Sequence, residues 1–427
     1  MSTADVLQLQ QPLTDGGIRS VNFFNGRLLA SKDLSREQAA RRESDWRLGL
    51  AVGDGVAFGF EVDQDKSLST PSAPVLSVKA GLAINRKGQT LRLTDDTRVA
   101  LTRRFEAVGT TCLFSDCVPL GGGTYVAGAG VYVLTVAPAE SSEGRAMTNG
   151  TDPTNVRCNT DATVEAVQFR LLTVKPSLYI GLDAASDAFR NRLAYLCFGT
   201  ANRHAWLGNL FGPDIDGYGL LDGMRSSSGL TDFDVPLALI FMAGSGTVKF
   251  IDRWAVRRTP SGTPETPQWL PLTSRRRLAE GQAMFMQFQE QIASLRTGSG
   301  DLGSVTASSR FALLPPVGVI PVSPEVDATD ALATKFFAGL TYRSPVFINV
   351  ARLETLIRQS LTYPPIDVTS GEMMWLYRVR ENAMAAEFSS GARPQRLVVF
   401  ASGHLPYVGD AQFDLAYWNY SNYALAR

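Results

Sequence analysis

The feature that most constrains the fold is a succession of short strand-like segments, with turn residues between them, over roughly the first 260 residues. Segments 77–80, 81–85 and 89–93 predict a run of hairpins, in which Gly88 supplies the positive φ of a tight turn. Segments 131–136 and 164–174 carry the alternating or β-branched apolar residues that are typical of strands. The pattern predicts a mainly β, multidomain chain with a few helices, an α+β fold, whose short antiparallel strands form sandwich-like or barrel-like domains.

The block 21–62 predicts an aromatic strand, a tight turn at Asn25-Gly26, a capped polar helix and a glycine-punctuated strand. Ser35 and Gln38 have the spacing of a capping box, so we expect the helix to run from Ser35 to about residue 48. This helix has little apolar surface to bury against its own domain, and the block contains no catalytic motif. We therefore interpret it as a docking device, whose partner-facing residues would be Phe23, Phe24, Arg27, Glu37, Arg41, Arg42 and Trp46.

The longest predicted helix runs over 274–295 and stops at Gly298. Its apolar residues follow a three-four spacing over about three heptads, which is the spacing of a coiled-coil seam. Two interpretations remain open: the seam packs on its own domain, which we favour, or it joins two copies of the chain. Gly281 in a core position weakens a coiled coil. Self-association would use Leu278, Phe285, Phe288, Ile292 and Leu295.

Four regions are expected along the chain. Residues 1–105 form an N-terminal docking segment with the capped helix and β-hairpins, and 106–273 form a central β-rich domain. The long amphipathic helix, 274–298, connects them to 299–427. This last region is a mixed α/β C-terminal domain with a helix over 349–361, strands after it and an aromatic tail. A second helix is expected over 186–198.

Composition excludes several classes of function. The 41 basic and 41 acidic residues cancel, so we expect no nucleic-acid partner. No segment supplies the ~20 apolar residues of a membrane-spanning helix, so we expect no direct membrane insertion. Residues 1–20 are polar and lack the apolar core of a signal peptide, which predicts synthesis and assembly in the cytoplasm.

Catalytic signals are thin, and we predict no catalytic, cofactor-binding or metal-binding residue, hence no enzyme. The chain has two histidines, His204 and His404, and lacks the common nucleotide-binding, hydrolase and metalloprotease motifs. His404 could act as a base with Asp410 or Asp414, but a histidine that packs at a strand end is the favoured interpretation.

Two groups of residues could hold a metal. Asp214, Asp216 and Asp222 surround glycine turns as calcium ligands do, but no closing glutamate stands at EF-hand spacing, and a polar loop is favoured. Zinc bound by the cysteines is the weaker alternative to buried free thiols; these are Cys112, Cys117, Cys158 and Cys197.

The C-terminal tail is rich in aromatic residues and allows two interpretations. It could close the core of the last domain, which we favour, or form a platform for a sugar or a partner. The residues are Phe413, Tyr417, Trp418, Tyr420 and Tyr423.

The motif NFFNGRLLASKDLSREQ, together with GVAFGFEV and GLAINRKGQTLRL, resembles the N-terminus of proteins encoded beside contractile phage-tail-like particles. Those are the extracellular contractile injection systems, and the proteins are baseplate-associated or tail-fibre-like components. Further similar segments span nearly the whole chain: PAESSEGRA, VRCNTDATVEAVQFRLL, FIDRWAVRR, FALLPPVGVIPV, YPPIDV, LYRVREN and FASGHLPYVGDAQFDLAYWNYSNYA.

The resemblance implies a structural role with no catalytic residue and no cofactor. The implied partners are other baseplate subunits and further copies of the chain in a symmetric ring, within a particle that can be released from the cell. The place of the chain would be a cage, a wedge-associated position or a fibre mount. The alternative function is a receptor-binding or carbohydrate-binding fibre-type protein of the same particle, which would contact a cell-surface glycan or receptor.

Overall fold

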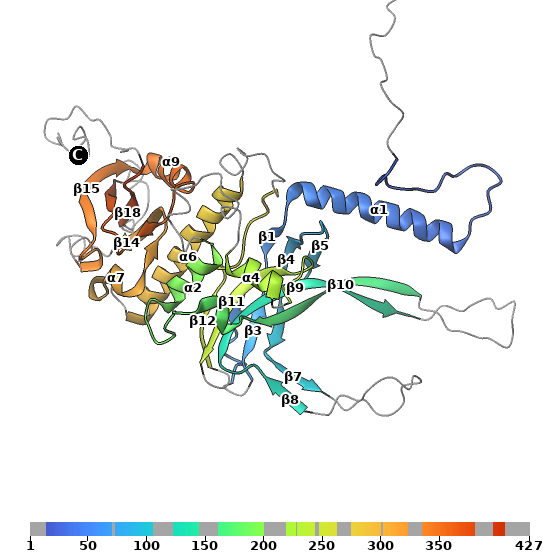
Figure 1. The fold of residues 1–427 in the computed structure, drawn as a ribbon, viewed down its shortest axis with the longest axis horizontal. Coiled ribbons are helices and arrows are strands. Elements are labelled where there is room, and N and C mark those ends of the chain that lie inside the picture. The colour runs from blue at the N-terminus through green and yellow to red at the C-terminus, as the bar shows by residue number, and fades with distance from the viewer. Residues whose placement is uncertain are drawn as a thin grey trace, which may run out of the picture.

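The computed structural model confirms the predicted mixed α+β fold with several small antiparallel sheets (Figure 1). It describes residues 14–70, 73–105, 123–144, 161–199, 219–227, 229–243, 247–262, 275–299, 302–322, 335–380 and 396–405. None of the helices in these ranges is long and apolar enough to cross a bilayer.

A four-stranded antiparallel sheet of order β10-β9-β11-β12 lies at the centre of the described structure. Its first pair confirms the strands predicted at 131–136 and 164–174, and both are longer than predicted. The strands are β9 (Gly130–Glu143), β10 (Ala162–Thr173), β11 (Val235–Ala243) and β12 (Thr247–Asp252). The ends of β9 and β10 extend beyond the body of the molecule as a two-stranded arm (Figure 1).

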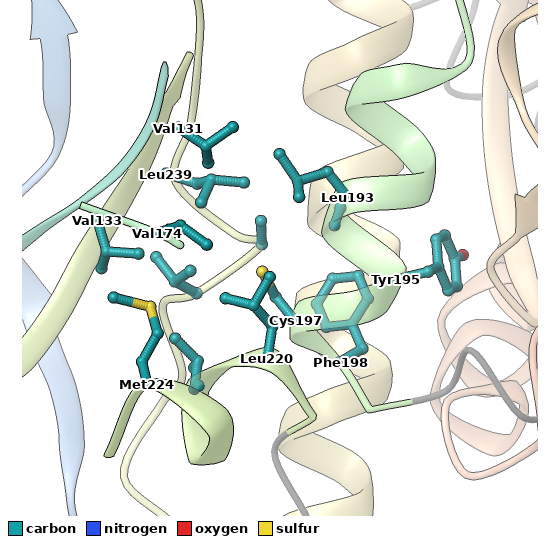
Figure 2. Packing of buried hydrophobic residues seen from close by; sticks show 14 of the residues in the cluster. Val131, Val133, Val174, Leu193, Tyr195, Cys197, Phe198, Leu220, Met224 and Leu239 are labelled. Atoms are coloured by element: carbon teal, nitrogen blue, oxygen red, sulfur yellow. The ribbon is translucent and has the colours of Figure 1, made fainter. Parts of the chain in front are cut away.

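Both faces of the central sheet contribute to a hydrophobic core, since successive side chains of a strand point to opposite faces. Val131 and Val133 of β9 pack with helices α2 (Phe189–Cys197) and α4 (Leu220–Ser227), as Figure 2 shows. Residues 132, 134 and 136 of β9 face the other way and share a core with the N-terminal strands. The helix predicted over 186–198 is thus confirmed as α2.

The N-terminal strands form two small sheets that pack on this second face. One has the order β1-β4-β5 and the other β2-β3-β6. The strands are β1 (Gly55–Gly59), β2 (Val62–Gln64), β3 (Val75–Val78), β4 (Gly81–Ile84), β5 (Thr90–Leu93) and β6 (Thr97–Ala100). The β4–β5 hairpin is confirmed, with Gly88 at φ 80° in its turn.

The predicted hairpin between 77–80 and 81–85 is wrong. The chain does not reverse there but bends and continues, because β3–β4 pairs along its whole length with the equally bent β1–β2. The bend in the latter lies at Gly59 and Phe60, which have φ 66° and 56°. Phe60 is fully buried, and its N–H donates to the Ala80 carbonyl at 3.3 Å. Burial of this ring in the shared core holds an unusual backbone conformation for a residue other than glycine.

A short ribbon of β7 (Thr102–Phe105) and β8 (Gly123–Val126) follows the N-terminal sheets along the chain.

The C-terminal unit is the predicted mixed α/β domain, a sheet of order β14-β18-β17-β15 between two helices. Strands β15 and β17 are parallel, and α9 connects them. Alternate strand residues face α6 on one side and α9 on the other, which buries both faces. The elements are α6 (Arg275–Ser299), β14 (Val317–Val322), β15 (Thr341–Asn349), α9 (Val350–Ser360), β17 (Met373–Arg380) and β18 (Arg396–Ser402).

Smaller elements complete the described chain. Helix α9 has the side chain of Asn349 as its N-cap, which accepts from the Ala351 N–H at 2.9 Å. The short pair β13 (Leu313–Leu314) and β16 (Ile366–Asp367) lies beside the C-terminal sheet. The remaining elements are η1 (Pro176–Tyr179), η3 (Leu302–Ser304) and α7 (Ala307–Arg310).

Helix α6 confirms the long helix predicted from residue 274, although it continues through Gly298 rather than ending there. Ala283 and Met284 lie in the core under the central sheet, whereas Phe288 and Ile292 lie in the core of the C-terminal sheet. One helix therefore contributes to two hydrophobic cores and joins the regions on either side of it.

Candidate functional site

Helix α1 (Ser31–Val52) extends away from the sheets as a 22-residue rod (Figure 1). It confirms the helix predicted over 35–48 and is longer at both ends. The C-terminal end of α1 leads directly into β1, whereas the N-terminal end is the part farthest from the body (Figure 1). An element that projects in this way is accessible to another molecule along most of its length.

The start of α1 lies four residues before the predicted capping box, so the box of Ser35 and Gln38 is wrong. The N-cap is Ala30, whose side chain has no acceptor, and the Asp33 carboxylate instead accepts from the Ala30 N–H at 3.1 Å. Arg27 donates to the same carboxylate at 2.7 Å. The Ala30 hydrogen bond, and after it Arg27, lowers the pKa of Asp33, so the cap is held by a charged group.

The segment before α1 runs back along the helix and is not the predicted aromatic strand. The Val21 N–H donates to the Glu37 carboxylate at 3.0 Å, and Arg47 donates to the Gly16 carbonyl at 2.7 Å. Val21 is buried in this contact. The predicted turn at Asn25-Gly26 is confirmed, since Arg27 N–H donates to the Phe24 carbonyl at 3.2 Å. Segment and helix thus form one ordered unit.

Two glycines allow the C-terminal part of α1 to approach the body closely. A Cβ at Gly49 would collide with the carbonyl of Gly88 in the β4–β5 turn. A Cβ at Gly53, which has φ 96°, would collide with Ser261. The helix root is therefore fixed by backbone contacts that larger residues would not permit.

The surface of this unit carries a concentration of exposed apolar side chains, which we term the N-terminal surface. It holds nine of the 17 exposed large apolar side chains among the residues whose side chains the structure describes, within a stretch of about thirty residues. Leu28, at 93%, is the most exposed of them. The set consists of Phe23, Phe24, Leu28, Leu29, Leu34, Trp46, Leu48, Leu50 and Val52.

The residues predicted to meet a partner fall into two groups. The aromatic residues are exposed, with Phe23 at 54%, Phe24 at 63% and Trp46 at 38%, and Arg41 and Arg42 are exposed as well. The other two are engaged inside the unit: Arg27 pairs with the helix cap, and Glu37 accepts the Val21 N–H. These two side chains hold the segment before α1 against the helix.

Sequence reasoning missed the leucines of the N-terminal surface. Trp46, Leu48, Leu50 and Val52 follow a spacing of two, so they fall on two opposite faces of α1 rather than on the single stripe of an amphipathic helix. The sequence pattern therefore predicts a polar helix. The sequence signal for these leucines is the high density of large apolar residues over 23–34, in a segment where apolar and polar residues do not alternate as they do in a strand.

The seam of α6 lies mostly inside the chain. Phe288 and Ile292 are 0% and 1% exposed, and Phe285 and Leu295 pack against the two cores of the C-terminal unit. Leu278, at 41%, is exposed. The seam packs on its own domain, which was the favoured interpretation, and its buried residues are not accessible to a second copy.

The histidine and metal candidates are only partly within the described residues. His404 is half-exposed, and its Nε2 lies 3.8 Å from Glu372, while His204, Asp410 and Asp414 lie outside the described residues. Asp222 lies in the first turn of α4. The other members of these groups, Asp214, Asp216, Cys112, Cys117 and Cys158, and the whole aromatic tail also lie outside the described ranges.

Cys197 is the cysteine that the structure describes, and it is fully buried in the core of Figure 2. Burial raises the pKa of its thiol to about 12, which makes it an unreactive core residue. Within the described ranges, no three residues of the His, Cys, Asp and Glu types are grouped as metal ligands would be.

No protein-family model matches this chain, and no curated protein matches it. The resemblance to components of contractile particles therefore remains a prediction.

Proposed function

We propose that this chain is a structural subunit of a contractile phage-tail-like injection particle, with no catalytic activity, and that its N-terminal surface docks on a neighbouring baseplate subunit. The observation that carries this proposal is the projecting α1 unit with its exposed aromatic and leucine side chains. Apolar patches on soluble proteins mark sites of interaction with other molecules.

The dimensions of the unit suit such a contact. A helix of 22 residues is about 33 Å long at a rise of about 1.5 Å per residue, enough to cross a standard protein–protein interface. Burying apolar surface contributes about 25 cal/mol per Å², so a few leucine and phenylalanine side chains seated in a groove dominate the binding energy.

The charged residues of α1 would set the orientation of the docked helix. The helix carries five basic and four acidic side chains, so its net charge is small and its charges are mixed. Glu43 and Arg47 form an exposed ion pair at 2.7 Å, which is a weak contact in water. In an interface, complementary charges of this kind fix register more than affinity.

The test uses the full chain with substitutions that leave the core untouched. Deleting everything up to residue 62 would remove Val56, Phe60 and Val62 from the core, so point variants are sharper. Phe24→Asp together with Leu28→Asp should abolish incorporation of the chain into purified particles, with the fold unchanged by circular dichroism.

Ile180→Asp is the matched control, because Ile180 is 81% exposed but lies far along the chain, after η1. This variant should be incorporated normally. Normal incorporation of the double variant would refute docking through the N-terminal surface. Failure of both variants would show that any added surface charge blocks assembly, and would remove the support for this surface.

A further inference from the structure

The turn before α1 holds an asparagine followed by a glycine, within the N-terminal surface. The Arg27 N–H donates to the Phe24 carbonyl at 3.2 Å, so Asn25 and Gly26 are the two central residues of the turn. Gly26 has φ 87°, a left-handed conformation that favours glycine. Both central residues are exposed, so water reaches the dipeptide from outside the fold.

No described residue holds the side chain of Asn25. Its amide forms no hydrogen bond with the described part of the chain, and a Cβ at Gly26 would meet nothing within 4 Å. The N–H of Gly26 also has no acceptor among the described residues. The Arg27 guanidinium joins the two sides of the turn through the Asn22 carbonyl, at 2.6 Å, but leaves the central residues free. The main-chain hydrogen bond that closes the turn contributes only about 1 kcal/mol, so the backbone there rotates readily.

The other asparagines that the structure describes are either protected or lack the glycine. Asn85 and Asn191 are each 1% exposed, and both ends of each side-chain amide are hydrogen-bonded. Asn349 caps α9 through its side-chain oxygen. Asn22 is exposed, but a phenylalanine follows it. Asn25 is therefore the described asparagine that combines exposure, a free amide and a following glycine.

These conditions favour deamidation, a reaction between the side-chain amide and the next main-chain nitrogen. Hydroxide removes the N–H proton of Gly26, and this nitrogen attacks Cγ of Asn25. The N–Cγ bond forms and the Cγ–Nδ2 bond breaks; Nδ2 leaves as ammonia with a proton from water, which restores the hydroxide. Water then opens the cyclic imide. Opening at Cγ leaves aspartate, and opening at the main-chain carbonyl leaves isoaspartate, with no oxidant or reductant involved.

We propose that Asn25 deamidates spontaneously in the folded chain and that the carboxylate formed there weakens docking through the N-terminal surface. The first part stands on the geometry of the turn, and the second rests on the proposed function. The product adds a negative charge to a segment in which Phe23, Phe24 and Leu28 are exposed for docking. Burying that charge in an apolar contact costs free energy. Protein that ages before assembly would therefore be incorporated less.

The reaction is followed in the full chain by peptide mapping. Cleavage after Arg19 and Arg27 releases a single peptide that carries both Asn22 and Asn25. During incubation in mildly alkaline buffer, Asn25 should be converted to the acid at least about tenfold faster than Asn22, and the native chain should react within about tenfold of the rate in urea. Equal rates at the two asparagines, or stronger protection by the native fold, overturn the first part of the proposal.

Gly26→Ala tests the dipeptide itself. A Cβ at this position obstructs the attacking nitrogen, so conversion of Asn25 should slow by about tenfold or more, and an unchanged rate would contradict the mechanism. The pair Asn149-Gly150, outside the described residues, lies in a different peptide, so the mapping separates the two sites.

The effect on docking is measured with Asn25→Asp, which carries the charge of the product, and with Asn25→Ser as the matched neutral control. Asn25→Asp should lower incorporation into purified particles by about tenfold, and Asn25→Ser should be incorporated as the natural chain is. Normal incorporation of Asn25→Asp, or equal loss in both variants, overturns the second part and leaves the reaction at Asn25 standing. The proposed function itself fails only if Phe24→Asp with Leu28→Asp is also incorporated normally, so the two failures are distinguishable.

Discussion

Two helices of similar length, α1 with 22 residues and α6 with 25, meet the rest of the molecule in opposite ways. Helix α6 lies between two cores and buries Ala283, Met284, Phe288 and Ile292. Helix α1 buries only Ala40 and Gly49 and leaves its large apolar residues in contact with solvent. Length and composition are therefore poor guides to what a helix does; the spacing of its apolar residues is the better guide.

The difference follows from geometry. Apolar residues spaced by three and four fall on one stripe of a helix, which a single sheet can cover. The spacing of two at the end of α1 places the apolar residues on two opposite faces of the helix, and no single surface of the same chain could bury both. A helix of that kind gains stability from a partner or remains exposed.

The largest effect is expected for Phe288→Ala in α6. The ring is fully buried and lies 5.2 Å, between centroids, from both Phe311 and Phe400. Removing it should lower the free energy of unfolding by about 3–5 kcal/mol. Chemical denaturation measures the change, and Leu278→Ala, at an exposed position of the same helix, should cost less than about 1 kcal/mol. Equal losses would show that the two positions are packed alike.

The next largest loss of stability is expected from replacing the glycine at which each helix makes a close contact with the rest of the chain. A Cβ at Gly281 of α6 would collide with the Leu361 carbonyl, and a Cβ at Gly49 of α1 with that of Gly88. Gly281→Ala should lower the free energy of unfolding by about 1–3 kcal/mol, because both sides of the contact are held in the core. Gly49→Ala should cost less, because this contact lies near one end of a helix that is otherwise exposed. Amide hydrogen exchange should then be faster in α1 only; a global loss as large as that of Gly281→Ala would contradict this.

The fold could be predicted where residues close together in the sequence determine the structure of their own segment. The seam of α6 and the β4–β5 turn at Gly88 are patterns of this type, and both were found. The bent ribbon of β1 to β4 was missed because the bend at Phe60 depends on burial in a core that other strands complete. The start of α1 was missed because Ala30 has no capping side chain, and Asp33 performs that role from inside the helix.

The candidate sites were predictable to different degrees. Phe23, Phe24 and Trp46 stood out as large apolar residues near charged ones, and the structure leaves them exposed. A pocket lined by Arg86, Arg225 and Arg258 had no sequence signal, because these residues lie far apart in the chain and only the folded structure brings them together.

A smaller effect is expected from charge, where the helices differ as well. Glu290 of α6 is mostly buried and pairs with Arg253, whereas Glu43 of α1 is exposed. Burial raises the pKa of Glu290, and Arg253 offsets part of the rise, with Asp252 and Arg190 close by. Because the folded pKa is raised, this group favours folding below the ordinary glutamate pKa of about 4.3, and that contribution is lost as pH rises through the folded value.

Glu290→Gln should therefore remove a pH-dependent part of the stability. The free energy of unfolding of the natural chain, relative to the variant, should increase as pH is lowered through the raised pKa of Glu290. Denaturation at a series of pH values measures this difference. A difference for Glu290→Gln that is flat with pH would show that the carboxyl of Glu290 has an ordinary pKa.

The smallest effect is expected for Leu48→Glu in α1, where the side chain is 66% exposed. An exposed position loses little packing, so the free energy of unfolding should change by no more than about 0.5 kcal/mol. The same substitution at Met284 of α6, which is 1% exposed, would bury an unpaired charge and should prevent stable folding. Denaturation of the two variants side by side measures the contrast.

A loss above about 1 kcal/mol for Leu48→Glu would mean that Leu48 is packed in the isolated chain, and α1 would then be a structural helix like α6. A negligible loss would show that Leu48 has no role in the stability of the isolated chain, as expected of a side chain that docks on a partner.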